Sequence, residues 1–114
     1  MAILIQIGEF HSQEIWRDGF AAVDPGLDLR LWPDVGDPAE IEAVIVWHHI
    51  HGSLKQFPNL KLICNLGAGV EAIFKDPDLP DGVPIARVVD PRLTRSMAEY
   101  VVLHVLPFHR HFAE

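Results

Sequence analysis

Short apolar runs, spaced along the chain and separated by helical or loop-like stretches, constrain the fold more than any other feature of the sequence. The runs read AILIQI (2–7), AVIVW (43–47), KLICNL (61–66) and IARVV (85–89). Continuous runs of this length are typical of strands that are covered on both faces, as in parallel sheets. A further strand is indicated at 27–31, where leucines alternate with Asp28 and Arg30 as at a sheet edge with one wetter face.

Helical patterns fill the intervals between the strands. Ser12 is a candidate N-cap of a first helix, Pro38 opens a short second helix, and single turns are indicated at 53–57 and 70–74. Strands that alternate with helices favour right-handed βαβ units. We therefore predict an α/β fold, a flavodoxin-like three-layer sandwich with a five-stranded parallel sheet in the order 2-1-3-4-5. The 114 residues are expected to form one domain, 1–114.

The last helical segment, from Arg92 to Leu106, is apolar on almost every side. Its apolar residues are Leu93, Met97, Val101 and Val105 near one face, with Val102, Leu103 and Leu106 widening that face. Such a helix is expected to be buried against a large surface, and Pro107 is expected to break or kink it. Because an exposed apolar area of this size usually finds a partner, we predict a homodimer through the Arg92–Leu106 helix.

The charge balance restricts the partners that the chain can have. There are 16 acidic against 9 basic residues, which gives a formal net charge of −7. Phosphate backbones and anionic membranes repel an acidic surface, so neither nucleic acid nor a membrane is expected as a partner. The N-terminus lacks a basic signal region, and Cys64 is the single cysteine, so no internal disulfide can form. These features predict a cytoplasmic protein.

The most informative local motif is Gly67-Ala68-Gly69-Val70, which lies between a buried strand and a helical turn. Two glycines allow a tight bend, and the free N–H groups at a helix start can bind a small anion such as a carboxylate. A plain tight turn without a ligand is the alternative. The motif is not the dinucleotide-binding fingerprint, because Ala72 stands where that fingerprint needs a third glycine.

Trp47 and the loop after it supply the next candidates. Trp47 ends a predicted strand at the same sheet edge, where its ring would either wall a small pocket or belong to the core. His48, His49 and His51 share the following loop, which suggests either metal ligation or a polar loop. We predict no metal site, because no cysteine or suitably spaced carboxylate completes a set of ligands.

Three further charged residues are candidates: Arg87 and Arg92 would either meet a carboxylate or be surface arginines, and Glu99 would either pair structurally or act on a substrate. Arg87 lies in the last predicted strand, Arg92 starts the long helix, and Glu99 is an acid on a mostly apolar helix that needs a partner. No nucleophile elbow, cysteine–histidine pair or phosphate loop is found in the sequence. The residues by themselves indicate an α/β domain with a small-anion site.

Three segments carry a resemblance to a known family: PNLKLICNLGAGVEAIF (58–74), LPDGVPIARVVD (79–90) and MAEYVVLHVLPFHRHF (97–112). In this order and spacing they resemble the glyoxylate/hydroxypyruvate reductase branch of the D-isomer-specific 2-hydroxyacid dehydrogenases. The resemblance implies a two-domain parent enzyme with its active site in the cleft between the domains. This chain would be the N-terminal, substrate-side domain, truncated before the Rossmann domain that binds the cofactor.

The same resemblance implies roles for particular residues. The backbone amides of Gly67, Ala68, Gly69 and Val70 would hold the carboxylate of a small 2-oxo acid, glyoxylate or hydroxypyruvate, and Trp47 would lie beside it. NADPH or NADH would serve the intact parent, bound by the missing domain that also carries the catalytic residues. We therefore expect this chain to bind no cofactor and to catalyse nothing alone. The alternative is a flavodoxin-like binding or interaction module without an enzymatic role.

Overall fold

The computed structural model describes residues 1–8 and 12–112. Strands and helices alternate along this part of the chain, as the apolar runs predict. The elements in chain order are β1 (Ala2–Ile7), α1 (Gln13–Val23), β2 (Asp28–Leu31), η1 (Pro38–Glu40), β3 (Ile41–Trp47), η2 (Ser53–Gln56), β4 (Leu62–Asn65), α2 (Glu71–Phe74), β5 (Ile85–Arg87) and α3 (Pro91–His109).

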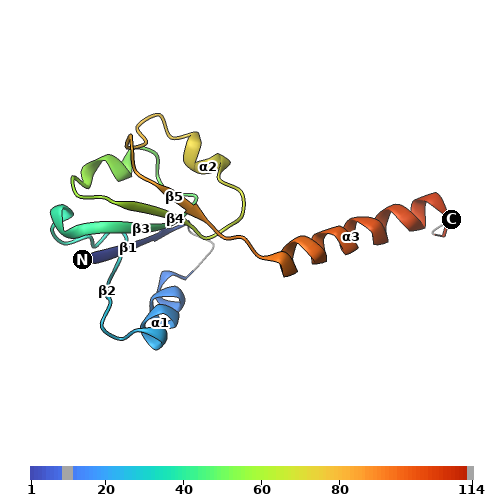
Figure 1. The fold of residues 1–114 in the computed structure, drawn as a ribbon, viewed down its shortest axis with the longest axis horizontal. Coiled ribbons are helices and arrows are strands. Elements are labelled where there is room, and N and C mark those ends of the chain that lie inside the picture. Colours follow the sequence, from blue (N-terminus) through green and yellow to red (C-terminus); the bar gives the residue numbers. More distant parts are fainter. Residues whose placement is uncertain (9–11, 113–114) are drawn as a thin grey trace.

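The five strands form one parallel sheet in the order β2-β1-β3-β4-β5 (Figure 1). The predicted fold class and strand order are therefore confirmed. β1 and β3 lie at the centre and form the longest ladder, in which Ile3 pairs with Ala43 and Ile7 with Trp47. β2, the strand with alternating leucines, lies at one edge as expected, and β5 lies at the other.

Alternate residues of the central strands supply two separate cores, one on each face of the sheet. Leu4, Val44 and Val46 point into the larger core, which η2 and α2 cover with Leu54, Phe57 and Ile73. The intervening residues Ile5, Ile7 and Ile45 form the smaller core on the opposite face, against which Phe20 of α1 packs. This alternation is what the period of two in a strand requires, and it produces the expected three layers.

Helix α1 covers its face of the sheet only partly. None of its residues is fully buried, and Ile15 and Val23 are 72% and 88% exposed. Ser12 occupies the N-cap position as predicted, but its side chain does not cap the helix, because the hydroxyl donates to the Glu14 carboxylate at 2.9 Å instead of accepting from a helix amide. The position was predicted correctly and the hydrogen bond was not.

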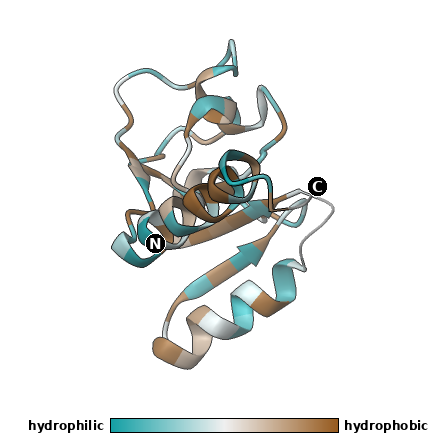
Figure 2. Cartoon of the chain, turned by 90° about the vertical axis from the view of Figure 1, so that its right-hand side faces the viewer, coloured by the Kyte–Doolittle hydropathy of each residue, from teal (hydrophilic) through white to brown (hydrophobic). Residues whose placement is uncertain are grey.

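Helix α3 projects away from the sheet, which gives the chain extents of 60 × 34 × 24 Å (Figure 1). Asp90 caps its start by accepting from the Arg92 amide at 2.9 Å, and Pro91 occupies the first helical position. None of its residues is buried within the described chain, so the expectation of a buried helix is not met here. In Figure 2, which shows the molecule from the right-hand side of Figure 1, hydrophobic (brown) residues recur along the helix.

Pro107 lies inside α3 without ending it, so of the predicted break or kink the break is wrong. The helix continues to His109, and the Arg110 amide still bonds to the Leu106 carbonyl at 2.9 Å. A proline removes the amide donor to the carbonyl four residues earlier, here that of Leu103, but the amides of the residues that follow it can still bond within the helix. None of the helices that the structure describes is both long and apolar enough to cross a membrane.

Candidate functional site

The carboxyl ends of the central strands meet at one edge of the sheet, where ligands bind in open α/β folds. Trp47 ends β3 there, and its carbonyl accepts a hydrogen bond of 2.9 Å from the Gly8 amide after β1. The Leu66 amide, just past β4, bonds in turn to the Val46 carbonyl at 3.1 Å. These bonds join the chain segments that leave the three strands and fix the start of the Gly67–Val70 turn.

The Trp47 ring lies against the backbone of Gly67. A Cβ atom at position 67 would lie 2.7 Å from Cη2 of this indole and closer still to Cζ3, which is a steric clash. Neither Gly67 nor Gly69 has a positive φ, so the turn does not need a left-handed residue. Glycine is required at position 67 for the close approach of the ring. The reason for glycine at this position is thus the ring contact and not the tight bend predicted from the sequence.

Asn65, the last residue of β4, stabilises the turn by side-chain hydrogen bonds. Its side chain is 5% exposed, and Nδ2 donates to the Gly67 carbonyl at 2.9 Å and to the Gly69 carbonyl at 2.7 Å. The amide of one side chain thus engages two carbonyls of the same turn. Asn65 is not among the site residues predicted from the sequence, although a polar residue inside the apolar run KLICNL is a usable signal.

The segment around β5 engages the turn from the side. The Val88 amide donates to the Gly67 carbonyl at 3.2 Å, and Nη1 of Arg87 donates to the Ala68 carbonyl at 3.4 Å. The carbonyls of Gly67, Ala68 and Gly69 are therefore all engaged. Among the described residues, no acceptor pairs with the amides of residues 68–70, so this turn offers donors and no free acceptors.

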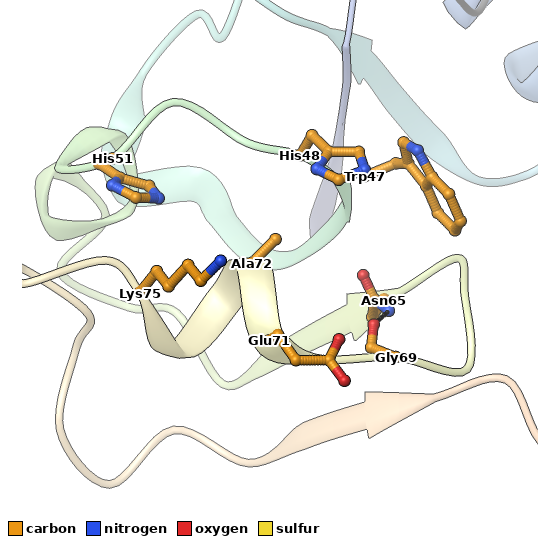
Figure 3. A pocket seen from close by; sticks show the side chains of 8 residues that line it. All are labelled: Trp47, His48, His51, Asn65, Gly69, Glu71, Ala72 and Lys75. Carbon is orange, nitrogen blue, oxygen red and sulfur yellow. Dashed lines mark hydrogen bonds between the residues drawn. The ribbon is translucent and has the colours of Figure 1, made fainter.

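A pocket of about 540 Å³ opens beside the turn (Figure 3). Its lining comes from the ends of β3 and β4, the loop after β3, and helix α2. The lining residues are Trp47, His48, His51, Asn65, Gly69, Glu71, Ala72 and Lys75. Of the predicted site residues, Trp47 and Gly69 line the pocket, whereas Gly67, Ala68 and Val70 belong to the same turn but not to the lining. Glu71 and Lys75, both on or next to α2, were missed.

The three neighbouring histidines separate in space. His48 has a φ of 52°, an uncommon value for a residue with a side chain, and this turns the chain so that His48 and His51 line the pocket while His49 points into the interior. The Trp47 and His48 rings meet edge to face with centroids 5.4 Å apart. Across the residues that the structure describes, no group of His, Cys, Asp or Glu side chains is arranged to hold a metal ion.

His49 forms a buried pair with Asp76, a residue that the sequence pattern does not single out. His49 Nε2 donates to Asp76 Oδ2 at 2.8 Å, and both side chains are fully buried. Burial alone would raise the pKa of Asp76, but the hydrogen bonds from His49 and from the amides of Asp78 and Gly52 outweigh it and lower that pKa. The pair therefore anchors the loop that forms one wall of the pocket.

The remaining charged candidates have different surroundings. Arg87 binds the Ala68 carbonyl at 3.4 Å and supports the turn, whereas Arg92 lies in the first turn of α3 with an exposed side chain. Glu99 has its partner in Arg95, one turn earlier on the same helix, at 2.9 Å. Only Arg87 is thus close to the candidate site.

No family model matches the chain. A curated relative from Serratia proteamaculans, named glyoxylate/hydroxypyruvate reductase A, is 34% identical over 110 residues; the match covers 92% of this chain and 35% of the relative. A relative of the same name from Photorhabdus laumondii is 36% identical over the same shares. The chain thus spans about a third of the length of the curated relatives that it matches.

Solved structures agree with these relatives. A D-isomer-specific 2-hydroxyacid dehydrogenase from Xanthobacter autotrophicus, in complex with NADPH and MES, superimposes with a TM-score of 0.79 at 38% identity, over 94% of this chain and 35% of that one. The chain is accordingly similar, over almost its whole length, to about a third of a D-isomer-specific 2-hydroxyacid dehydrogenase. Within that family its similarity is to the proteins named glyoxylate/hydroxypyruvate reductase A, the same branch as the sequence motifs indicate.

Proposed function

We propose that this chain is the substrate-binding lobe of an NAD(P)-dependent glyoxylate/hydroxypyruvate reductase. The observation that carries the proposal is the Gly67–Val70 turn. Asn65, Arg87 and Val88 donate hydrogen bonds to the carbonyls of residues 67–69, whereas no acceptor among the described residues pairs with the amide N–H groups of residues 68–70. Amides without acceptors form their strongest hydrogen bonds with an ionised oxygen, so the turn is suited to the carboxylate of a small 2-oxo acid. Similarity to reductases over 92% of the chain supports this more than a binding module of another class.

In this proposal Gly67, Ala68, Gly69 and Val70 contribute backbone donors, and Trp47 walls the site. The indole covers one side of the turn and excludes water from it, which strengthens hydrogen bonds to a charged ligand. Because the pocket is open to solvent on its other side, the lobe is expected to bind a 2-oxo acid weakly by itself. A second domain facing the turn would complete the enclosure.

The chain's own residues do not fit a dinucleotide. The turn opens into α2, which has only four residues, and Ala72 occupies the place of the third glycine in a dinucleotide-binding turn. A solved relative from Sinorhizobium meliloti that is 28% identical holds NADP and sulfate, and the chain spans 35% of its length. We therefore assign the cofactor and the catalytic residues to a further domain and expect no turnover by this chain alone.

The decisive experiment titrates the labelled chain with glyoxylate and follows its backbone amides by NMR, with neutral glyoxylamide as the matched control. The amides of residues 68–70 are expected to shift with glyoxylate and not with the control. Absence of a shift at these amides would show that the turn is not a carboxylate site. Mixing the chain with a separately produced cofactor domain, NADPH and glyoxylate then tests whether the two parts together oxidise the nicotinamide.

We further propose that the intact protein forms a homodimer through α3 and works in the cytoplasm. The dimer is supported by the exposed apolar residues of α3, among them Met97, Val101, Leu103 and Phe108, which are 53–80% exposed. The location is supported by Cys64, a free cysteine that is compatible with a reducing compartment.

A further inference from the structure

The pocket beside the turn has a second end, and the proposed function leaves this end unused. Trp47, Asn65 and Gly69 gather at one side of it, next to the turn (Figure 3). His51 and Lys75 gather at the other side, and the Lys75 amine points into the space beside Ala72 (Figure 3). The loop after β3 and the end of α2 thus bring two nitrogen-bearing side chains to a place away from the turn.

Within the part of the chain that the structure describes, Lys75 differs from the other lysines in having no ion-pair partner. Lys55 lies 3.6 Å from the Asp78 carboxylate and Lys61 lies 3.0 Å from the Glu42 carboxylate. Over residues 1–8 and 12–112, no carboxylate lies within ion-pair distance of Lys75. Lys75 is exposed and Glu71 lines the same pocket, so the Lys75 ammonium attracts an anion only where Glu71 does not neutralise it.

Glu71 is the carboxylate that helical spacing would offer to Lys75. Residues four apart lie on the same side of a helix, and a glutamate that precedes a lysine at this spacing usually attracts it. Here Glu71 instead turns back towards the glycine turn, where its Oε2 lies 2.6 Å from the position that a Cβ on Gly69 would take. The Lys75 ammonium is therefore left available to a ligand.

We infer that this end of the pocket binds a second anionic group, so that, of the small 2-oxo or 2-hydroxy acids that the turn can hold, the lobe binds one with a further carboxylate at its far end more tightly than one without it. The inference rests on the proposed function, in which the first carboxylate binds the amides of residues 68–70. Gly69 of the turn and Lys75 line one pocket of about 540 Å³, a volume that holds a short dicarboxylate. Lys75 attracts the second carboxylate by charge, and His51 adds a ring nitrogen beside it.

The experiment compares D-lactate with D-malate, 2-hydroxy acids that differ by one carboxylate. Both are titrated at low ionic strength into the chain, into Lys75→Gln and into Lys61→Gln, and the amides of residues 68–70 and the His51 ring are followed by NMR. D-malate is expected to bind about fivefold more tightly than D-lactate to the unchanged chain, and Lys75→Gln is expected to abolish this difference without changing D-lactate binding. Lys61→Gln removes an equal charge at the amino end of β4 and should leave both affinities unchanged.

The possible outcomes separate this inference from the proposal on which it rests. If D-lactate shifts the turn amides but D-malate binds no better, or if Lys75→Gln leaves the preference intact, the second subsite is wrong and the carboxylate site stands. If neither acid shifts the turn amides, the carboxylate site and the subsite are both wrong. A His51 ring that responds to D-malate but not to D-lactate would support the subsite independently of the affinities.

Discussion

Trp47 packs its indole so closely on Gly67 that no side chain fits at position 67 without moving the ring. Gly67→Ala is therefore expected to displace Trp47, weaken glyoxylate binding by at least tenfold and cost about 1–3 kcal/mol of unfolding free energy. Urea unfolding and NMR titration measure the two effects. Gly19→Ala in α1, where nothing lies within 4 Å of the new methyl group, is the matched control and should stabilise the chain slightly. Unchanged binding in Gly67→Ala would mean that the position of the indole does not matter to the site.

Asn65 should be essential for the shape of the turn, because its side chain bonds to two of the turn's carbonyls. Asn65→Ala leaves those carbonyls without this donor, and we expect a loss of about 1–3 kcal/mol in the free energy of unfolding together with weaker carboxylate binding. Asn59→Ala, which removes one exposed bond of 2.8 Å to the Ala39 carbonyl, serves as the control and should cost less than about 1 kcal/mol. Equal effects of the two substitutions would contradict a special role for Asn65.

The buried Asp76 carboxylate should make the stability of the chain depend on acid. Its pKa is lowered from the ordinary 3.8 in the folded chain, so it contributes stability above that pH, and this contribution is lost as the pH falls through the folded pKa. Asp76→Asn is expected to lose about 2 kcal/mol at neutral pH and to show a flatter decline of stability below pH 4. Urea unfolding at several pH values measures both, with exposed Asp18→Asn as the control. A decline in Asp76→Asn as steep as in the unchanged chain would rule out this carboxylate as its source.

The proposed dimer predicts that apolar residues of α3 control the oligomeric state. Leu103, which is 62% exposed, lies in the middle of the helix. Leu103→Glu should convert a concentration-dependent dimer into a monomer, because a buried charge at an interface is strongly unfavourable. Sedimentation of the two forms at high micromolar concentration tests this, with Val23→Glu on α1 as a control at a position that is 88% exposed. An unchanged chain that sediments as a monomer would contradict the proposal.

The strand pattern could be predicted because burial on both faces leaves a direct mark on the sequence. Ile5 and Val44 belong to opposite cores, and both appear in continuous apolar runs that only a covered parallel sheet requires. The exposure of α3 could not be predicted in the same way. An apolar helix signals that some surface covers it, and its sequence does not say whether that surface belongs to the same chain.

The site was predicted in part, and the missed residues share a physical reason. Trp47 and the glycine turn were found because strand ends and glycines are visible in the sequence. The His49–Asp76 pair joins positions that are 27 residues apart. The residues around His49 and those around Asp76 form no pattern that indicates burial. His48, His49 and His51 look alike in sequence, and the backbone turn at His48 is what separates a buried residue from two that line the pocket.

The engaged carbonyls of the glycine turn have a consequence for molecular recognition. Since Asn65, Arg87 and Val88 hold the turn from different parts of the chain, its donors are preorganised before any ligand arrives. An incoming acid then loses its own freedom but does not have to order the receiving backbone. The turn contacts only the carboxylate, which all such acids share. Discrimination among these acids therefore depends on contacts between the protein and the group at the other end of each acid.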